Sequence, residues 1–585
     1  MKRKLFWLTF ATSVFFSLTG FLFPGELVQA LSEENLIWQA EYSVQFKDRP
    51  VGKVILGMSP HPENNQLFWL WRRQTISAAT ISGLPPGTRI EEATLLDLQA
   101  KLPLSYQKQQ IFGNRKNTVT YSFDYQSNTV TLSQTMGDYS ASQTSYLSNT
   151  IYDPLSLLFL ILENDWEEKS ELQLFSLTSG LVEAKLKAKE LPLTLNSTSH
   201  STQKIELKNQ NFSQILYLDR EQKYIVKVES TAPRIKIILT GWQEKEIELP
   251  EIIQSKLRLP EPKKTPVTPP KEKSDLPFTE RQAFFYNQNL RLAGTLTLPS
   301  VQSGPFPAVL IIGGSGPLDR NGNIPGSIFQ PNLLQALAHN LSAAGFLTFR
   351  YDKRGVGQSS GDYTTAGFFD LIEDARCALS FLKKQPAVEL KHISILGHSE
   401  GGMIAYSLTA EEAVISALIL LATPAKPLVE LVKEQTTYLY LISGITNQET
   451  IKKAIENQEK IVEAIKEGKT TVEGISIPLW KWWKEHLEFQ PLEFLEKVQV
   501  PTLILQGGKD YQVTEEDADI LISTLEKNGV PAKKLIFPEL DHFFRPTKSE
   551  HSSPEEYLSQ KRVIPPYVFQ EILDWLETTA LLPNN

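Results

Sequence analysis

Residues 393–408 read ISILGHSEGGMIAYSL, and this stretch decides the fold of the C-terminal half of the chain. The run Ile393–Leu396 predicts a buried strand, and Met403–Leu408 predicts a helix. Between them, GHSEG at 397–401 is a G-x-S-x-G sequence. A strand that turns this tightly into a helix needs glycine on both sides, and it holds a serine hydroxyl out of the sheet at the helix N-terminus. We therefore predict Ser399 as a nucleophile; the alternative is a glycine-rich turn with an incidental serine.

A serine hydroxyl is a weak nucleophile until a base takes its proton, so a histidine held by a carboxylate is expected elsewhere. In this kind of fold the acid and then the histidine each follow a later strand. The buried run Thr502–Leu505 leads to Asp510, and Leu535–Phe537 leads to His542. His551 also follows Asp510, but it lies in a polar stretch farther from any predicted strand. Asp510 and His542 are therefore predicted to complete the triad; the alternatives are a turn-capping aspartate and a surface histidine.

The oxyanion of a tetrahedral intermediate needs backbone N–H donors. One predicted donor is the amide of Glu400, directly after the nucleophile. The other should come from the glycine-rich loop GGSGPLDRNGN at 313–323, which follows the apolar run Ala308–Ile312. We favour the N–H of Ser315, with that of Gly314 as the alternative. The loop could instead cradle a phosphate, but it lacks the pattern G-x-x-x-x-G-K-[ST].

The sequence predicts that residues 278–585 form an α/β domain. Short, continuous apolar runs suit strands buried on both faces, and the helical patterns between them predict a parallel sheet covered by helices. Before these runs, Leu290–Leu298 alternates like an edge strand. The buried runs are 308–312, 346–349, 393–396, 417–421, 502–505 and 535–537, and the helical patterns include 333–344 and 371–383.

The alternation of predicted strands and helices is interrupted between about residues 426 and 498. This interval has only helical patterns, such as Glu449–Glu467, and predicts a helical lid inserted over one end of the sheet. Gln435, Trp480 and Trp483 are candidate substrate-binding residues of this lid. The aromatic side chains of the two tryptophans could line an acyl pocket. The alternative is that such residues simply pack the lid against the domain.

Residues 31–250 are predicted to form a separate, mostly β domain. In Val119–Tyr125 apolar and polar residues alternate, and the turn Gln126–Asn128 leads to a second such run. Half-buried strands of this kind predict an antiparallel sandwich or a barrel-like fold. The sequence YDPLSLLF at 152–159, with Asp153 and Pro154 as an N-cap and N1 pair, begins a predicted helix over Leu155–Leu162. Through it the region is faintly similar to periplasmic β-rich domains of unknown function.

Two segments are predicted to lie outside both domains. Residues 251–277 are rich in proline and lysine, which predicts an extended, solvated linker. At the N-terminus, Lys2–Lys4 precede the apolar run Leu5–Phe23 and the small residue Ala30, so residues 1–30 are predicted to be a secretory signal peptide. We expect an exported protein, periplasmic or secreted. The alternative is membrane anchoring by an uncleaved N-terminal segment.

Charge and cysteine content exclude several classes of function. The chain has 585 residues, a formal net charge of −8 and one cysteine, Cys377. It therefore lacks the broad positive field that attracts nucleic acid. A single cysteine excludes an intrachain disulfide and a cysteine-based zinc site. Because the predicted serine chemistry needs neither a metal nor an organic cofactor, we expect none.

Five motifs occur in order along the C-terminal half: GGSGPLDRNGN at 313–323, RYDKRGVGQSSG at 350–361, GHSEGG at 397–402, VPTLILQGGKDYQV at 500–513 and DH at 541–542. They resemble the α/β-hydrolase superfamily, and more closely the serine aminopeptidase S33-like group that includes EstD-type carboxylesterases. The resemblance covers about 280–580. It implies Ser399, Asp510 and His542 as the triad, and ester hydrolysis more often than peptidase activity. The chain departs from the family at Gly313, where histidine is usual, and at Asn321, where aspartate is frequent.

Together these patterns predict an exported serine hydrolase that cleaves small carboxylic esters through an acyl-enzyme on Ser399. His542 would act first as a base and then as an acid, while Asp510 would hold its tautomer. Two alternatives remain. One is a serine peptidase of the S33 kind, and the other is a non-enzymatic envelope protein that binds through its β domain and carries a relic hydrolase fold. Membrane or cell-envelope association would involve the N-terminus or the β domain.

Overall fold

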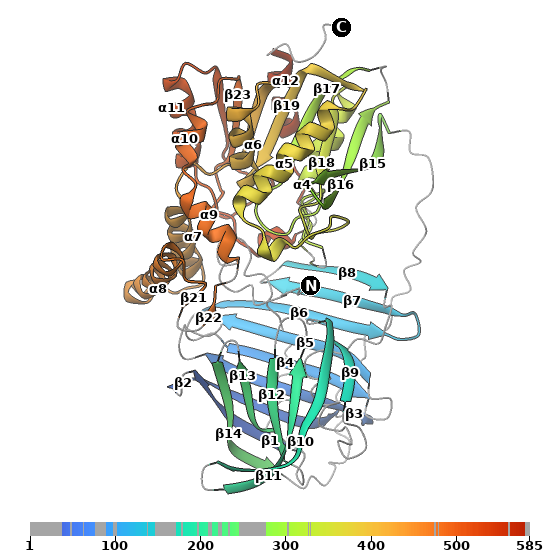
Figure 1. Cartoon of the computed structure of the whole chain (residues 1–585), viewed down its shortest axis with the longest axis vertical. Helices are drawn as coiled ribbons and strands as arrows, with labels where there is room; N and C mark the ends of the chain where they lie inside the picture. The colour runs from blue at the N-terminus through green and yellow to red at the C-terminus, as the bar shows by residue number, and fades with distance from the viewer. Residues whose placement is uncertain are drawn as a thin grey trace.

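The structure is a computed structural model (Figure 1). It describes residues 38–46, 49–61, 64–76, 89–97, 102–136, 139–146, 171–176, 180–195, 198–208, 213–219, 225–231, 234–244, 276–300, 304–325, 327, 329–472, 475–477, 479–559 and 562–578. The predicted signal peptide, the predicted helix at 155–162 and residues 251–275 of the predicted linker lie outside this set. Within the described ranges, no helix has both the length and the apolar composition needed to cross a membrane.

An eight-stranded sheet forms the centre of the C-terminal half, in the order β15-β16-β18-β17-β19-β20-β23-β24. The first two neighbouring pairs are antiparallel and the other five are parallel. Each predicted buried run overlaps one strand of the parallel part. The strands are β15 (Phe278–Asn287), β16 (Leu290–Pro299), β17 (Phe306–Ile312), β18 (Leu347–Tyr351), β19 (Val388–His398), β20 (Ile415–Leu421), β23 (Thr502–Gly507) and β24 (Ala532–Phe537).

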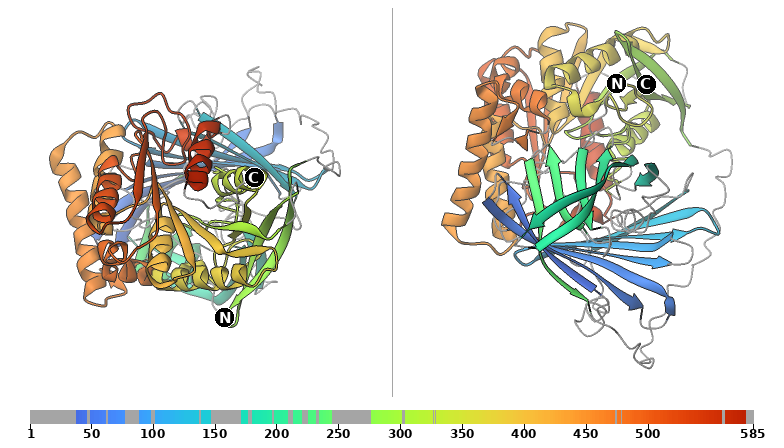
Figure 2. Two further views of the ribbon diagram at one scale, coloured as in Figure 1. Left: turned by 90° about the horizontal axis from the view of Figure 1, so that it is seen from above. Right: turned by 60° about the horizontal axis from the view of Figure 1, so that its bottom comes forward.

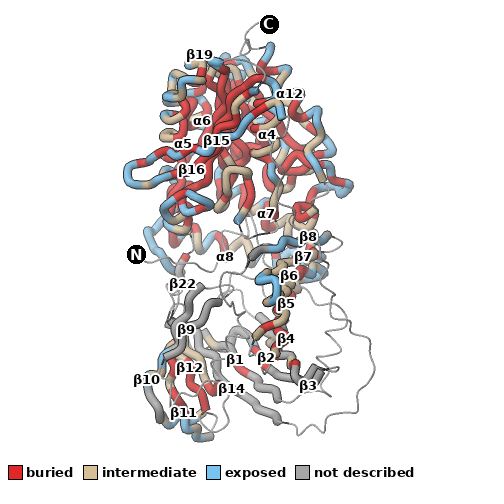
Figure 3. The backbone as a smooth tube through the Cα atoms, turned by 90° about the vertical axis from the view of Figure 1, so that its right-hand side faces the viewer, coloured by how far each residue is buried: buried red, intermediate tan, exposed pale blue. Residues whose placement is uncertain are grey.

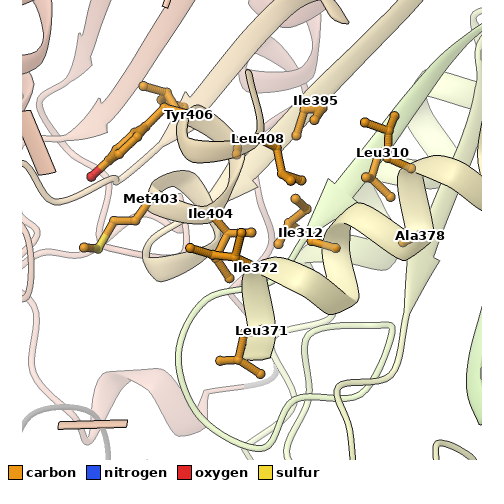
Figure 4. Packing of buried hydrophobic residues seen from close by; sticks show 14 of the residues in the cluster. Leu310, Ile312, Leu371, Ile372, Ala378, Ile395, Met403, Ile404, Tyr406 and Leu408 are labelled. Atoms are coloured by element: carbon orange, nitrogen blue, oxygen red, sulfur yellow. The ribbon is translucent and has the colours of Figure 1, made fainter. Parts of the chain in front are cut away.

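Helices cover both faces of this sheet: α4 (Leu333–Ala343), α5 (Phe368–Lys383), α6 (Glu400–Glu411), α11 (Glu515–Lys527) and α12 (Pro566–Thr578). Alternate residues of β17 enter two different apolar cores, because successive side chains of a strand point to opposite faces. Leu310 and Ile312 lie in the core that also contains residues of α5, α6 and α11, as Figure 4 shows for α5 and α6. Val309 and Ile311 lie in the core that contains residues of α4 and α12. Figure 3 shows how densely buried positions fill this half. The α/β fold predicted from the buried runs is confirmed.

The edge of the sheet differs from the prediction. Leu290–Leu298 is predicted as an edge strand, but β16 lies between β15 and β18, and Leu292 and Leu296 are buried. The edge strand is β15, in which Thr279–Gln282 are all exposed. Four exposed polar residues in a row break the alternation of apolar and polar residues, which is why the sequence pattern does not reveal this strand.

An insertion of helices separates β20 from β23, at the left of Figure 1. Its helical content agrees with the predicted lid, and a short two-stranded ribbon, β21 with β22, is an addition that the sequence pattern does not indicate. Helix α7 packs against α8 and α9, and α10 packs against α6 and α11. The elements are α7 (Leu428–Ile442), α8 (Gln448–Lys466), β21 (Thr471–Val472), β22 (Ile475–Ser476), α9 (Trp480–Glu488) and α10 (Pro491–Leu495).

The N-terminal half contains one antiparallel sheet of fourteen strands, in the order β8-β7-β6-β5-β4-β3-β2-β1-β14-β13-β12-β11-β10-β9. The mostly β prediction is confirmed, and the strands form one curved sheet (Figures 1 and 2), nearer to the barrel-like form than to a sandwich of two sheets. The strands are β1 (Trp38–Phe46), β2 (Arg49–His61), β3 (Asn64–Ile76), β4 (Arg89–Asp97), β5 (Leu102–Phe112), β6 (Arg115–Asp124), β7 (Thr129–Met136), β8 (Tyr139–Tyr146), β9 (Glu171–Ser176), β10 (Gly180–Leu195), β11 (Thr198–Lys208), β12 (Ser213–Asp219), β13 (Ile225–Thr231) and β14 (Arg234–Glu244).

Strands β1 and β14 lie side by side in the middle of this sheet. Trp38 of β1 is the partner of Glu244 of β14, so the first and last residues of the described sheet form one cross-strand pair. Every other pair of strands consecutive in sequence is also paired in the sheet, except β8 and β9. These two strands form the two edges of the sheet and do not pair with each other. The sheet therefore consists of two meanders that meet along the β1–β14 ladder.

The sheet contacts the C-terminal half through the turn between β5 and β6 and through β7. The N–H of Asn114 donates to the carbonyl oxygen of Ser443 over 3.0 Å. Arg115 forms an ion pair with Glu555, next to the short helix η3 (Glu556–Leu558). Met136 of β7 is buried in the same apolar core as α4 and α12. The two halves therefore share polar contacts and a common core.

Candidate active site

The turn from β19 into α6 places Ser399 at the end of a central parallel strand. Ser399 has φ 55° and ψ −126°, a strained conformation for a residue with a Cβ atom. The two flanking glycines are required by close backbone approach. A Cβ atom on Gly397 would overlap the carbonyl oxygen of Gly401, and one on Gly401 would overlap that of Ile312. The chain can therefore make this turn only with glycine at both positions.

Asp510 and His542 lie together beyond the carboxyl ends of two neighbouring parallel strands. Asp510 follows β23 and His542 follows β24, and the Nδ1 atom of His542 lies 2.6 Å from Oδ2 of Asp510. The other oxygen, Oδ1, accepts hydrogen bonds from the amides of Gln512 (2.7 Å) and Val513 (3.1 Å). Gln506 donates to Oδ2 over 3.3 Å. These contacts fix the carboxylate plane and leave Nε2 of His542 as the free ring nitrogen.

His398, the residue before Ser399, contacts His542. The His398 and His542 rings have centroids 4.7 Å apart. Burial, with repulsion from His542, holds the pKa of His398 well below its usual value, so that its ring is neutral. A carbonyl can only accept, and Nε2 of His398 therefore donates to the carbonyl oxygen of His542 over 2.9 Å. Ser399 is only 1% exposed, and among the described residues its Oγ has no hydrogen-bond partner.

The glycine-rich loop after β17 lies directly against the nucleophile. A Cβ atom on Gly314 would come within 3.0 Å of the Cβ of Ser399. The carbonyl oxygen of Gly314 accepts a hydrogen bond from Nζ of Lys353 over 2.6 Å. Within the part of the chain that the structure describes, the amides of Ser315 and Glu400 donate to no other backbone group. Neither predicted oxyanion donor thus has a backbone acceptor among the described residues.

The contacts of the Glu400 side chain are not predictable from the sequence. It is buried beside the nucleophile, with Oε2 2.8 Å from Nζ of Lys353. Its Oε1 accepts from Nε1 of Trp482 (2.6 Å) and is 3.1 Å from Nε2 of His486. Burial opposes ionisation of this carboxyl, but the charge of Lys353 and the contact with His486 outweigh it and lower the pKa of Glu400 to about 2. Glu400 is therefore a buried carboxylate.

A few sequence signals could have indicated this cluster. Lys353 lies within the motif RYDKRGVGQSSG, and Trp482 and His486 are four residues apart, which places them on one face of a helix. No local pattern joins them to Glu400, because they come from separate segments of the chain.

The three candidate lid residues lie at different places. Nε2 of Gln435, which is buried, donates to the carbonyl oxygen of Gln512 over 2.7 Å, so Gln435 braces the loop that carries the predicted acid. Trp480 donates to the carbonyl oxygen of Lys469 over 2.8 Å. Trp483 is buried and lines a narrow cavity between α7 and α8. Their contacts are with the insertion and the acid loop, and substrate binding by these three residues stays a prediction.

A metal site would need a cluster of ligating side chains. The described segments contain no group of three or more His, Cys, Asp or Glu residues arranged to hold a metal ion.

The fold defines the class of the C-terminal half. Its eight-stranded sheet, with two antiparallel strands before a parallel series, carries a serine at a glycine-flanked strand-to-helix turn after a central strand. The C-terminal half therefore has the α/β-hydrolase fold. In sequence, residues 325–542 match the family described as serine aminopeptidase, S33.

Two curated relatives are similar in sequence. The chain is 31% identical over 286 residues to Esterase EstD of Thermotoga maritima, a match that covers 49% of this chain and 65% of that protein. It is 32% identical over 73 residues to Dipeptidyl peptidase family member 6 of Caenorhabditis elegans, covering 12% of this chain and 10% of that protein. The chain therefore spans less than two thirds of the length of either relative.

Two solved structures are similar to about half of this chain. Est1E from Butyrivibrio proteoclasticus, with ferulic acid bound, is 16% identical and covers 51% of this chain and 99% of its own, with a TM-score of 0.34. The esterase Pf2001 from Pyrococcus furiosus is 15% identical and covers 53% of this chain and 96% of its own, also with a TM-score of 0.34.

Proposed function

We propose that this protein is an exported serine hydrolase that cleaves small carboxylic esters through a covalent acyl-enzyme on Ser399. The observation that carries the proposal is the buried His542–Asp510 pair, which contacts His398, the residue directly before a serine in a strained turn. A strained backbone at a serine next to a hydrogen-bonded His–Asp pair is typical of a nucleophile and its base. The similarity to Esterase EstD supports an ester as the substrate.

In the first half of the reaction, Oγ of Ser399 attacks the ester carbonyl carbon. Its proton passes to Nε2 of His542, because Nδ1 is bonded to Asp510. Catalytic hydrogen bonds are often long in a substrate-free enzyme and shorten in the complex, and the bond from Ser399 to His542 must form at this step. The negative charge on the carbonyl oxygen is stabilised by the amides of Ser315 and Glu400.

In the second half, the tetrahedral intermediate collapses and the C–O bond to the alcohol breaks. The imidazolium of His542 gives its proton to the departing alkoxide, which leaves the acyl group on Ser399. Water then attacks the acyl carbon, with His542 as the base, and the carboxylic acid leaves as Oγ recovers its proton. Asp510 stabilises the imidazolium in both halves without taking up the proton.

The carboxylates around the site favour an ester over a peptide with a free N-terminus. An aminopeptidase needs an available carboxylate to bind the substrate ammonium group. Glu400 is held by Lys353, Asp510 by His542, and Oδ2 of Asp541 by Arg562 over 2.6 Å. Each of these carboxylates next to the candidate site already has a cationic or hydrogen-bonding partner. A serine peptidase remains the second candidate because the family match carries that name.

Export is proposed from the sequence of residues 1–30, in which basic residues precede an apolar run and small residues. Expression of the full-length chain in a bacterial host, followed by fractionation and N-terminal sequencing, tests it. A mature N-terminus near residue 31 in the periplasm or medium supports cleavage and export. Recovery of the intact chain in the membrane fraction supports the anchored alternative, and recovery in the cytoplasm contradicts export.

Labelling of the full chain with a fluorophosphonate probe tests the nucleophile. Wild-type protein should be labelled and should hydrolyse short acyl nitrophenyl esters, whereas Ser399→Ala should do neither. Ser407→Ala is a matched control, because Ser407 is a buried serine of α6, the helix that follows Ser399, and its Oγ donates to the carbonyl oxygen of Met403. Comparison with aminoacyl anilides separates esterase from peptidase. A folded wild-type protein that is neither labelled nor active would contradict the proposal and support a binding role.

A further inference from the structure

Lys353 touches both loops that carry the proposed oxyanion donors. It follows β18 and its side chain is buried, at 6% exposure. Its Nζ atom lies 2.6 Å from the carbonyl oxygen of Gly314 and 2.8 Å from Oε2 of Glu400. Gly314 precedes the donor Ser315, and Glu400 is itself a donor through its amide. One ammonium group therefore connects the glycine-rich loop to the residue after the nucleophile.

The geometry of the peptide bond gives this contact a consequence. The C=O of Gly314 and the N–H of Ser315 belong to one planar trans peptide, in which the two groups point in opposite directions. With the C=O held on Lys353, the N–H of Ser315 must point away from Lys353. This peptide begins at the Cα atom of Gly314, which lies close to Ser399: a Cβ atom built on it would come within 3.0 Å of the Cβ of Ser399. Lys353 thus sets which end of this peptide dipole faces the nucleophile.

The loop needs such a restraint because its sequence is permissive. Gly313, Gly314 and Gly316 can adopt backbone conformations closed to other residues, so the peptide between Gly314 and Ser315 could rotate. A rotated peptide would present a carbonyl oxygen where the oxyanion forms, and two negative oxygens would repel. The peptide after Ser315 is also held, because the N–H of Gly316 donates to the hydroxyl of Tyr363 over 2.9 Å.

Lys353 is fixed in turn by partners on several sides. Glu400 neutralises its charge, and the ring of Tyr363 lies 5.6 Å from Nζ. Glu400 is anchored by Trp482 and His486 of α9, which belong to the helical insertion. A buried lysine with this set of partners has little freedom to leave the carbonyl of Gly314.

We propose that Lys353 is a positioning residue for the oxyanion hole: it holds the Gly314–Ser315 peptide in the one orientation that directs the Ser315 N–H to the developing oxyanion. The inference rests on the proposed esterase function. Lys353 does not touch the substrate; it acts through the backbone of Gly314. Its loss should therefore weaken binding of the transition state much more than binding of the ester.

The variant Lys353→Met tests this in the full chain, with a short acyl nitrophenyl ester as the substrate and a trifluoromethyl ketone as the inhibitor. The ketone forms a hemiketal on the serine, and its oxyanion occupies the same donors. Loss of one oxyanion donor lowers kcat by about 10²–10³-fold, so a donor that is misdirected part of the time should lower it by about 10–100-fold. We expect KM to change by less than about threefold, and the ketone Ki to rise by the factor by which kcat/KM falls.

Controls separate positioning from stability. Lys353→Met leaves the carboxylate of Glu400 buried with one partner fewer, so the double variant Lys353→Met/Glu400→Gln removes both charges if the single variant does not fold. Leu525 is a buried residue of α11. The variant Leu525→Ala should lower the melting temperature and leave kcat and Ki nearly unchanged. Lys533→Met, which removes an exposed lysine paired with Glu571, should change neither.

Two results would overturn the inference. One is a folded Lys353 variant that fails the kinetic test: its kcat stays within about twofold of wild type or falls without a rise in the ketone Ki. The other needs no variant: in a crystal structure of the wild-type hemiketal, the oxyanion lies outside hydrogen-bonding distance of the Ser315 amide. A wild-type chain that neither hydrolyses esters nor reacts with fluorophosphonate defeats the proposed function itself, whereas an active wild type with an unaffected Lys353 variant defeats only the role of Lys353.

Discussion

Nδ1 of His542 lies 2.6 Å from Oδ2 of Asp510, and the two residues are only 2% and 3% exposed. Replacement of Asp510 by Asn should keep this shape but allow the histidine to adopt the other tautomer, with its proton on Nε2. We expect kcat for ester hydrolysis to fall by about 10⁴-fold, with a small change in melting temperature. The measurement is steady-state hydrolysis of a nitrophenyl ester by the full chain.

Asp519→Asn is the matched control for this substitution. Asp519 lies on α11, is exposed and pairs with Lys534, so its loss should leave kcat unchanged. Retention of more than a tenth of the wild-type kcat by Asp510→Asn would show that another group orients His542.

The buried carboxylate of Glu400 should make stability depend on pH in acid. Its pKa is lowered from 4.5 to about 2 in the folded protein, so between these values the unfolded chain binds more protons than the folded one. Stability must then rise with pH: the contribution of Glu400 is complete above about 4.5 and is lost as pH falls towards 2. It is on the order of 3 kcal/mol.

Urea unfolding of the wild type and of Glu400→Gln at a series of pH values from 2 to 6 measures this contribution. The difference between the two free energies of unfolding should shrink as the pH falls, because glutamine does not titrate. A constant difference across that range would mean that Glu400 is not ionised in the fold.

Gly401 should tolerate no side chain. A Cβ atom there would overlap the carbonyl oxygen of Ile312, so Gly401→Ala must push α6 away from β17. We expect a loss of stability of about 3 kcal/mol or more, together with loss of activity. Gly529→Ala is the comparison, because Gly529 has φ +73° but open space around it. This substitution should cost only about 1–2 kcal/mol, from backbone strain at a positive φ. Thermal denaturation of both variants checks this, and equal losses would contradict it.

The ion pair of Arg115 with Glu555 should hold the N-terminal sheet against the C-terminal half. Arg115→Glu brings two carboxylates together at a partly buried contact and should weaken it by about 1–2 kcal/mol. Hydrogen exchange of the Asn114 amide, which is bonded to Ser443, should then become faster. The charge swap Arg115→Glu/Glu555→Arg should restore slow exchange. If the swap exchanges as fast as the single variant, the pair does not hold the two halves together.

Features encoded within a few neighbouring residues could be predicted from the sequence. The turn at Ser399 needs glycines in fixed places. Asp510 and His542 each follow an apolar run that forms a parallel strand, so both lie at the carboxyl ends of the strands. The buried strands are recognisable for the same reason, because helices on both faces require unbroken apolar runs.

Features that depend on contacts between distant segments could not be predicted. Lys353 and His486 lie 47 and 86 residues from Glu400, and neither has a local pattern that singles out its partner. Strand β15 is hidden because an edge position lets Thr279–Gln282 face solvent, and this erases the periodicity that marks a strand. Likewise, alternating residues indicate half-buried strands, but the choice between one curved sheet and two stacked ones depends on which strands pair.

The pairing of Trp38 with Glu244 has a mechanical consequence. The chain enters the N-terminal sheet at one of these residues and leaves it at the other, at the same end of two adjacent antiparallel strands. Tension between the two ends would therefore pass through the β1–β14 ladder alone and would not load the other twelve strands. Because both ends are pulled from the same side, the ladder would open one hydrogen bond at a time, as a zipper does, and would yield at a lower force than strands that must slide past each other.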